Sequence, residues 1–563
     1  MVVLKRRRTR RHRAPIGLLP VGLAPAGGAQ AGEMPPAGRA VAAALLLAAL
    51  WGCGGGGGGG SDDGPLPGPP GRLDPIYDAT LVFPDAVVTS GGLTYQGIVL
   101  DLEITFDDPT VRDADPRFSA PVRVVAVTAG GVAQPFSVPF PIVLQGAIDG
   151  PLFETDLFGS IVFGSANLVV SMTGTIAPGA RRIDGTAALF QTSHTGPFAA
   201  LRRRRYLVAG TDLSSSVGQV TVVEARYDHD VSQAAGLETI SSDPIARVGD
   251  GRPFVVNRLS FDNLQGLDPA NGFRTALQYS TGNGSNPHDL AVLTDAAAGV
   301  PPGTTTGGAT GGGAGVAFVT RYEPPYDDVA LFDLDDGALL GSIDLVPLAT
   351  NPDRLPRPDQ MLDLDGRLWV TLQDANRSFT EFRTGRLAVI DPAARQVIDV
   401  IDLAGQNPFE ALVYLPETGL IYVGLAGIFP GLKPQALTGG IEAIDPVTRR
   451  SLGLVVDDDD LGGNVSGIAI VSATRGYAVV TDAAFRNAIK AFDPSTGQVL
   501  GTMYETADRI ATLVSDGDGW VLVAETSFVT PRLLIFDGTD GRVVAVLPLQ
   551  LPPLSVAIMT RGL

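Results

Sequence analysis

The chain has 563 residues and carries 41 lysine and arginine side chains against 60 aspartate and glutamate side chains, for a formal net charge of −19. An acidic chain repels phosphate backbones, so this balance argues against nucleic-acid binding. The single cysteine, Cys53, excludes a disulfide within the chain. Charged residues make up only 18% of the sequence. Valine, isoleucine, threonine and glycine dominate between turn signals, which predicts an all-β protein.

The first 52 residues are typical of a targeting segment. The apolar stretch 40–51 is too short to cross a bilayer as a helix, which takes about 20 residues, but it has the length of a signal-peptide core. With Leu50 and Gly52 placed before Cys53, it resembles a bacterial lipoprotein signal, although Trp51 is bulkier than such signals usually carry. Met34 precedes a compact basic segment, so we expect translation to begin there. The basic residues at 5–11 allow a twin-arginine export signal as the alternative.

The resemblance to lipoprotein signals implies that Cys53 receives lipid and becomes the mature N-terminus. The first expected partner is therefore a membrane, and the expected location is the bacterial cell envelope. Gly54 follows the cysteine in place of the aspartate that retains such proteins at the inner membrane. The resemblance thus favours an outer-membrane lipoprotein, and it leaves open whether the protein faces the periplasm or the cell surface.

Two further regions precede the long C-terminal part. Residues 53–71 are rich in glycine and proline and cannot pack a core, so we expect a disordered tether. Residues 72–201 show the alternation of about seven strands with hairpin turns, which predicts a small β-sandwich or barrel. A spacer or an interaction module is its simplest role.

After position 205 the sequence repeats a pattern of a strand, an acidic residue, a tight turn and a second strand. The acidic residues that mark the seven copies are Glu224, Asp268, Asp333, Asp391, Asp445, Asp493 and Asp537. They are separated by 44 to 65 residues, the period of propeller blades with loop insertions. An aspartate can accept hydrogen bonds from turn amides two residues on, so these acids are predicted to be structural. The strand at 554–559 is predicted to complete the first blade.

Several segments resemble the YVTN-type, lactonase-like seven-bladed propellers of bacterial envelope proteins. The segments that carry this resemblance are Phe254–Arg258, Leu267–Pro269, Gly284–Asp289 and Gln406–Pro408. The resemblance covers residues 205–563 and implies the fold, whereas this architecture hosts unrelated activities.

The loops at one face of such a propeller are the first place to look for a site. Polar residues there that are predicted to converge around the channel are Asn257, Arg258, His288, Arg321, Tyr322, Asp374, Asn376, Asp482 and Glu525. Convergent polar side chains in a funnel suit a binding site. The alternative is that they only cap strand ends. The acidic run 457–460 is interpreted as a solvated connector, with calcium binding as the alternative. The arginine run 202–205 is interpreted as a solvated junction between domains, and the alternatives are a clamp for an acidic partner or a protease site.

The supply of reactive residues argues against richer chemistry. The mature chain contains only His194, His229 and His288, so a multi-histidine metal site is not expected. Cysteine pairs for haem attachment and a phosphate-binding glycine loop are missing. We therefore predict no catalytic residue, no metal and no cofactor.

Two functions are compatible with these patterns. The first is a lipid-anchored envelope protein whose propeller acts as a binding or scaffold module, with an envelope protein or a glycan as a possible partner. The second is a propeller enzyme of the lactonase or cofactor-dependent oxidoreductase type, which would need His288 together with Arg258 or Arg321.

Overall fold

The computed structural model describes residues 76–559, apart from 91–92, 107–116, 139–140, 150–151, 156–157, 164–165, 177–181, 191–193, 213, 226–230, 260, 296, 300–314 and 432. Cys53, Met34 and the tether lie outside the described residues. Within the described residues, the regular elements are β-strands, two 3₁₀ turns, η3 (Pro269–Asn271) and η4 (Val346–Leu348), and the short helix α2 (Asp458–Leu461). The all-β prediction is confirmed. In the described part, no helix combines the length and the apolar character needed to cross a membrane.

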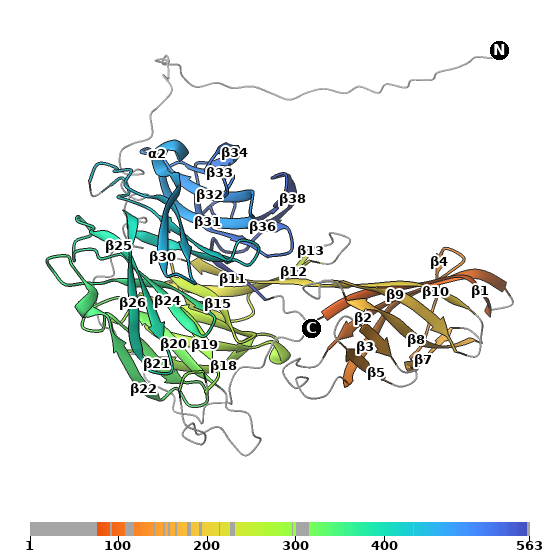
Figure 1. Ribbon diagram of the computed structural model, residues 1–563. Coiled ribbons are helices and arrows are strands. Elements are labelled where there is room, and N and C mark those ends of the chain that lie inside the picture. Colours follow the sequence, from red (N-terminus) through yellow and green to blue (C-terminus); the bar gives the residue numbers. More distant parts are fainter. Residues whose placement is uncertain are drawn as a thin grey trace, which may run out of the picture. The chain divides into compact units, whose positions relative to one another are not determined.

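The first domain is an eight-stranded antiparallel barrel, which decides between the two predicted folds (Figure 1). Its sheet follows the order β2-β1-β10-β9-β8-β6-β5-β3, and β3 pairs back with β2, which closes the sheet. The barrel strands are β1 (Ile76–Ser90), β2 (Leu93–Thr105), β3 (Arg117–Ala129), β5 (Ile142–Asp149), β6 (Leu152–Thr155), β8 (Ala166–Ile176), β9 (Arg182–Leu189) and β10 (Thr195–Arg202). Two extra strands, β4 (Val132–Ala133) and β7 (Phe158–Phe163), pair with β3 and β8.

Side chains fill the barrel interior. Alternate residues of each strand point inward, as the period of a strand requires. They include a chain of aromatic contacts in which Phe118 stacks on Phe153 with ring centroids 5.6 Å apart. Gly185 is required by the backbone, because a Cβ there would lie 2.0 Å from the carbonyl oxygen of Thr173. The barrel is therefore a packed core.

Seven further sheets form the blades of a propeller. The first blade comprises β11 (Arg204–Asp212), β12 (Val217–Ala225), β13 (Val231–Ala234), β14 (Thr239–Ser241) and β39 (Pro553–Ile558). The second and third blades comprise β15 (Pro244–Gly249), β16 (Arg252–Asn257), β17 (Asn263–Asp268), β18 (Arg274–Ser280), β19 (Pro287–Leu293), β20 (Val316–Arg321), β21 (Asp328–Asp333) and β22 (Leu339–Asp344).

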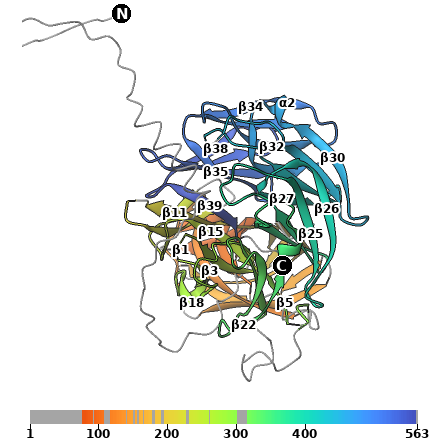
Figure 2. The ribbon, with the colours of Figure 1, turned by 90° about the vertical axis from the view of Figure 1, so that its left-hand side faces the viewer.

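The remaining four blades repeat the same four-stranded order. The fourth and fifth blades comprise β23 (Pro358–Leu364), β24 (Arg367–Leu372), β25 (Thr384–Asp391), β26 (Gln396–Gln406), β27 (Pro408–Leu415), β28 (Leu420–Leu425), β29 (Gly440–Asp445) and β30 (Arg450–Asp457). The sixth and seventh comprise β31 (Asn464–Ser472), β32 (Arg475–Thr481), β33 (Asn487–Phe492), β34 (Val499–Thr506), β35 (Arg509–Ser515), β36 (Trp520–Thr526), β37 (Arg532–Asp537) and β38 (Val543–Pro548). Figure 2 shows inner strands such as β15, β27, β35 and β39 nearer the middle of the ring than outer strands such as β18, β26 and β34.

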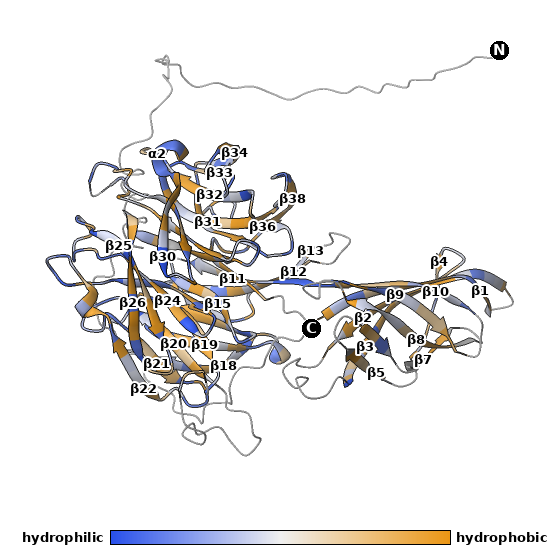
Figure 3. Cartoon of the chain, in the orientation of Figure 1, coloured by the Kyte–Doolittle hydropathy of each residue, from blue (hydrophilic) through white to orange (hydrophobic). Residues whose placement is uncertain are grey.

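The last strand closes the ring, as predicted. Strand β39 pairs antiparallel with β11, and Val556 lies opposite Val208. Both valines belong to a hydrophobic cluster that also contains residues of the seventh blade, such as Leu522 and Ile535. Apolar residues are concentrated along the blade strands in Figure 3. The pairing therefore covers the inner edge of β11 and buries apolar surface between the first and last blades.

Six of the seven repeated acids fix the turn after the third strand of their blade. Their carboxylate oxygens accept a hydrogen bond from a backbone N–H two or three residues on, at 2.8–3.0 Å. The six are Asp268, Asp333, Asp391, Asp445, Asp493 and Asp537. Glu224 differs, because its carboxylate binds the guanidinium of Arg205 at 3.0 Å. The structural role predicted for the aspartates is confirmed.

Two charged runs are more buried than predicted. Asp457 caps α2, and the buried Asp458 accepts a hydrogen bond from the backbone N–H of Gly439 at 3.0 Å. Arg204 lies over the ring of Trp520, 3.7 Å from its centroid. The prediction of solvated charges is wrong at Asp458 and Arg204, because these side chains lie against other groups of the protein and not in solvent.

We expect the substitution Val556→Asp to destabilise the propeller by at least about 3 kcal/mol, because it places a charge in the apolar cluster that closes the ring. The matched control is Val546→Asp in the outer strand β38, where the valine is 51% exposed and the cost should stay within about 1 kcal/mol. Urea unfolding of both variants measures the difference. Equal losses would mean that the β39–β11 pairing is not critical.

Candidate ligand-binding site

The inner strands are built to present side chains to the central channel. In six of the seven blades, the pairing of the inner strand with its neighbour shifts register near the start of the inner strand. Such a bulge turns residues out of the regular ladder and re-aims their side chains. The residues at the third position of four inner strands are Asp289, Gln360, Ser466 and Ser555, and all four line one cavity.

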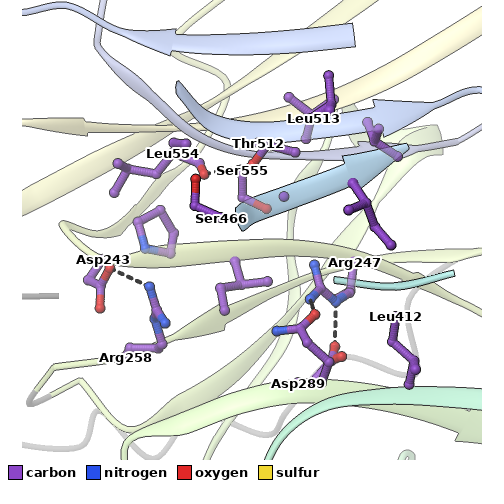
Figure 4. Close-up of a pocket in the computed structure, with 18 of the residues that line it drawn as sticks. Asp243, Arg247, Arg258, Asp289, Leu412, Ser466, Thr512, Leu513, Leu554 and Ser555 are labelled. Atoms are coloured by element: carbon purple, nitrogen blue, oxygen red, sulfur yellow. Dashed lines mark hydrogen bonds and ion pairs between the residues drawn. The ribbon is translucent and has the colours of Figure 1, made fainter. Parts of the chain in front are cut away.

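This cavity has a volume of about 230 Å³ and lies where the seven inner strands meet. Its apolar wall includes Ile245, Met361, Leu412, Val413, Ile468, Leu513, Val514, Leu554 and Val556. Its polar wall consists of Asp243, Arg247, Arg258, Asp289, Gln360, Ser466, Arg509, Thr512 and Ser555. Figure 4 shows ten of the lining side chains with labels. The lining combines apolar side chains with many polar ones, and a concave space with convergent polar groups is where proteins bind small molecules.

Two arginines of the cavity are matched with its two aspartates. Arg247 forms an ion pair with Asp289, and its Nη2 also donates to Gln360 Oε1 at 2.9 Å. Arg258 Nη2 contacts Asp243 Oδ1 at 2.7 Å. Both pairs are visible in Figure 4. Since the side chain of Arg247 is 25% exposed, solvent reaches this pair.

A third arginine and a serine hydroxyl in the cavity have no partner within the described residues. In the described part of the chain, the Arg509 guanidinium has neither an ion pair nor a hydrogen bond. The Ser466 hydroxyl is buried and, across the same residues, has no hydrogen-bond partner. The two residues come from the neighbouring inner strands β35 and β31. The cavity therefore holds one uncompensated positive charge and an unused buried donor.

Of the nine residues predicted for the site, Arg258 lines this cavity and the other eight do not. Two of the eight lie together. The ring of His288 stacks on that of Tyr322 with centroids 4.0 Å apart. His288 Nδ1 lies 2.9 Å from Asp359 Oδ1, and the Tyr322 hydroxyl donates to Gln373 Oε1 at 2.5 Å. Burial lowers the pKa of His288, which favours the neutral imidazole.

Three more of the predicted residues hold loops and strand ends together. Arg321 binds both carboxylate oxygens of Asp328, at 2.7 and 2.6 Å. Asp374 accepts from the backbone N–H groups of residues 350 and 351 at 2.9 and 3.0 Å. The Asn257 side-chain nitrogen donates to Gln265 Oε1 at 2.9 Å. Each of these polar groups is occupied by the protein itself.

The last three predicted residues lie in separate loops. The Asn376 side-chain oxygen, Oδ1, accepts from the Thr380 N–H at 2.9 Å. Asp482 accepts from the Ala484 N–H at 2.8 Å within its own loop. Glu525 is fully buried, accepts from the Tyr504 hydroxyl at 2.9 Å and forms an ion pair with Arg532. The channel does not bring these three together.

Sequence reasoning missed the inner-strand residues because it examined loops. A signal for them exists. Five of the seven inner strands begin with a proline, at 244, 287, 358, 408 and 553, and the residue two positions on is polar after four of them. These positions align across blades, so they mark a common level of the channel. Nothing in the sequence alone distinguishes Arg509 from the other arginines, because its role in the cavity depends on the side chains that surround it.

A buried carboxyl lies in the loop between β20 and β21. Asp327 is 2% exposed, and its Oδ1 has no hydrogen-bond partner within the described ranges. Burial raises the pKa of Asp327 to about 7, against the opposing influence of the nearby Arg357 cation. Arg357 is held by Glu323, 2.6 Å from its Nη1. The folded protein thus favours the protonated form of Asp327 at mildly acid pH.

The comparisons with known proteins are sparse. Neither a protein-family model nor a curated protein matches the chain. Among solved structures, the chain is similar to Kuenenia stuttgartiensis hydrazine synthase, with 15% identity over 61% of this chain and 95% of that chain and a TM-score of 0.36. It is also similar to apo AztD from Citrobacter koseri, with 11% identity over 63% of this chain and 98% of that chain and a TM-score of 0.37. A likeness of this extent says nothing about what the chain binds.

We expect Asp327→Asn to stabilise the protein at pH 8, and to stabilise it by less than half as much at pH 5. The carboxyl ionises near pH 3.8 in the unfolded chain but only near pH 7 in the folded protein, so the wild type loses stability as the pH rises from about 3.8 to about 7. The amide cannot ionise, and it removes a penalty of at most about 4 kcal/mol at pH 8. Thermal unfolding of the variant and the wild type at both pH values measures the effect.

The matched control is Asp365→Asn, because Asp365 is exposed and shares the left-handed φ of Asp327, 50° against 47°. Asparagine tolerates this conformation, so neither variant strains the backbone. A stabilisation of Asp327→Asn that is the same at pH 5 and pH 8 would contradict the protonated carboxyl.

Proposed function

We propose that the chain is a non-catalytic binding protein whose site is the cavity in the central channel of the propeller. One observation carries this proposal: the cavity combines an apolar wall with polar groups of which Arg509 and Ser466 are left without a partner in the described structure. The Ser466 hydroxyl is buried, and buried polar groups are normally satisfied, so its unused donor beside the partly exposed Arg509 indicates a place for a ligand.

The enzyme alternative has weaker support. It relies on His288 with Arg258 or Arg321, but His288 has Asp359 at one ring nitrogen and Asn286 at the other, at 2.9 and 3.2 Å. Arg321 is held by Asp328 through two hydrogen bonds. The second ring nitrogen of His288 and the Arg321 guanidinium are thus engaged with the protein itself. Among the described residues, no group of three or more histidine, cysteine, aspartate or glutamate side chains could hold a metal ion.

The size of the cavity favours a small solute. Pockets for drug-sized ligands start at about 300 Å³, and this one is smaller, at about 230 Å³. A folded partner protein does not enter such a space. Binding of an envelope protein or a glycan at the loop face stays a prediction, and it is independent of the cavity.

We further propose that lipid on Cys53 holds this binding module at the cell envelope, on an outer membrane. The support is the resemblance of residues 40–53 to a lipoprotein signal. The substitution Cys53→Ser is expected to move the protein from the membrane fraction to the soluble fraction and to abolish incorporation of labelled fatty acid. If labelled fatty acid is still incorporated into the Cys53→Ser variant, Cys53 is not the lipidation site.

The binding function is tested by filling the cavity. Ser466→Phe places an aromatic ring where the wild type has a hydroxyl without a partner, so no hydrogen bond is lost, while Ser466→Ala keeps the space open. A thermal-shift screen of the full chain against a library of small water-soluble solutes should find compounds that stabilise the wild type and Ser466→Ala, but not Ser466→Phe. Compounds that stabilise all three proteins equally would place the binding site elsewhere.

A further inference from the structure

The acceptor oxygens of Asp289 and Ser555 are occupied, whereas the donors of Arg509 and Ser466 have no partner among the described residues. Asp289 accepts from Arg247, from the Leu290 N–H at 2.8 Å and from the Met361 N–H at 2.7 Å. The Ser555 oxygen accepts from the Ala246 N–H at 3.1 Å. The Thr512 hydroxyl donates to the Leu554 carbonyl at 3.0 Å, and so it is used as well.

This imbalance selects the charge of the ligand. A cation would face the unpaired Arg509 and would find the cavity's carboxylates already engaged with Arg247 and Arg258. An anion, in contrast, can accept from both Arg509 and Ser466. Hydrogen bonds to a charged partner are about twice as strong as neutral ones, and arginine matches the two oxygens of a carboxylate.

The number of charges and the apolar wall of the cavity further restrict the chemical class of the ligand. Three arginines face two aspartates in the lining, which leaves one positive charge. A monoanion balances that charge, whereas a dianion such as phosphate would bring an uncompensated charge into a partly apolar space, which is costly. Leu412, Leu513 and Leu554 line the same cavity and suit an apolar body.

We infer that the ligand is a small monocarboxylic acid with a short apolar body. Its carboxylate accepts hydrogen bonds from the Arg509 guanidinium and the Ser466 hydroxyl, and its body contacts the leucines of the channel. This inference rests on the proposed binding function and adds the chemical class of the ligand. The net charge of −19 does not prevent entry, because at 0.15 M salt exposed charges are screened beyond about 8 Å.

The test is calorimetric titration of the full chain at 0.15 M salt with benzoate and hexanoate, and with benzyl alcohol and inorganic phosphate as comparison probes. At least one of the two acids should bind, and neither comparison probe should bind as tightly. Arg509→Met should raise the Kd of that acid by at least about tenfold, and Ser466→Ala by about fivefold. Neither substitution removes a hydrogen bond within the described structure, so both variants should fold, which a melting curve verifies.

The matched control is Arg450→Met, because Arg450 is exposed at the start of β30 and does not line the cavity. It should leave the Kd unchanged. Binding of benzyl alcohol as tight as that of benzoate, or a Kd unaffected by Arg509→Met, would overturn the carboxylate assignment. If neither acid binds while solutes from the library still depend on an open cavity at Ser466, the binding function stands and this inference fails. If cavity filling has no effect on any solute, the binding function itself fails.

Discussion

The pairing of β39 with β11 is the interaction on which the propeller depends. A ring of seven blades closes only if its two ends meet, and here one strand from the end of the described chain completes the sheet of the first blade. The apolar cluster around Val208 and Val556 then joins the first blade to the last. The position of every inner strand around the channel follows from this closure, because the channel is the space that the closed ring encloses.

The closed ring also explains why the candidate site is made of strands. Each inner strand contributes to one cavity, and the bulges near the strand starts bring polar residues to the same level. Within this wall, Arg247 pairs with Asp289 and Arg258 pairs with Asp243, whereas Arg509 has no ion-pair partner in the described part of the chain. The loops, by comparison, use their polar groups on one another, as Arg321 with Asp328 and Asp374 with Asn351 show.

The fold could be predicted from local patterns because local patterns cause it. Asp493 and its counterparts fix turns through hydrogen bonds to residues two or three positions away. Because both partners lie in the same short segment, these turns can be predicted from the sequence. The sequence could not distinguish a sandwich from a barrel, because the difference depends on the pairing of β2 with β3 around a shared core. The site was hardest to predict. Tyr322 and Glu525 look available in the sequence but are buried against other residues, whereas Arg509 gains its meaning only from side chains of other blades.

The Asp-capped hairpins and the closing strand differ greatly in the length of chain that separates their partners. Each hairpin joins neighbouring residues and can form as soon as its own segment exists, whereas β11 must wait for β39 while six blades are synthesised between them. Contacts between distant segments form slowly, because the loop-closure entropy is lost before the contact is gained. The nascent propeller should therefore persist as an open crescent with an unpaired edge at β11, and that edge is where chaperones would be needed and where misassembly would begin.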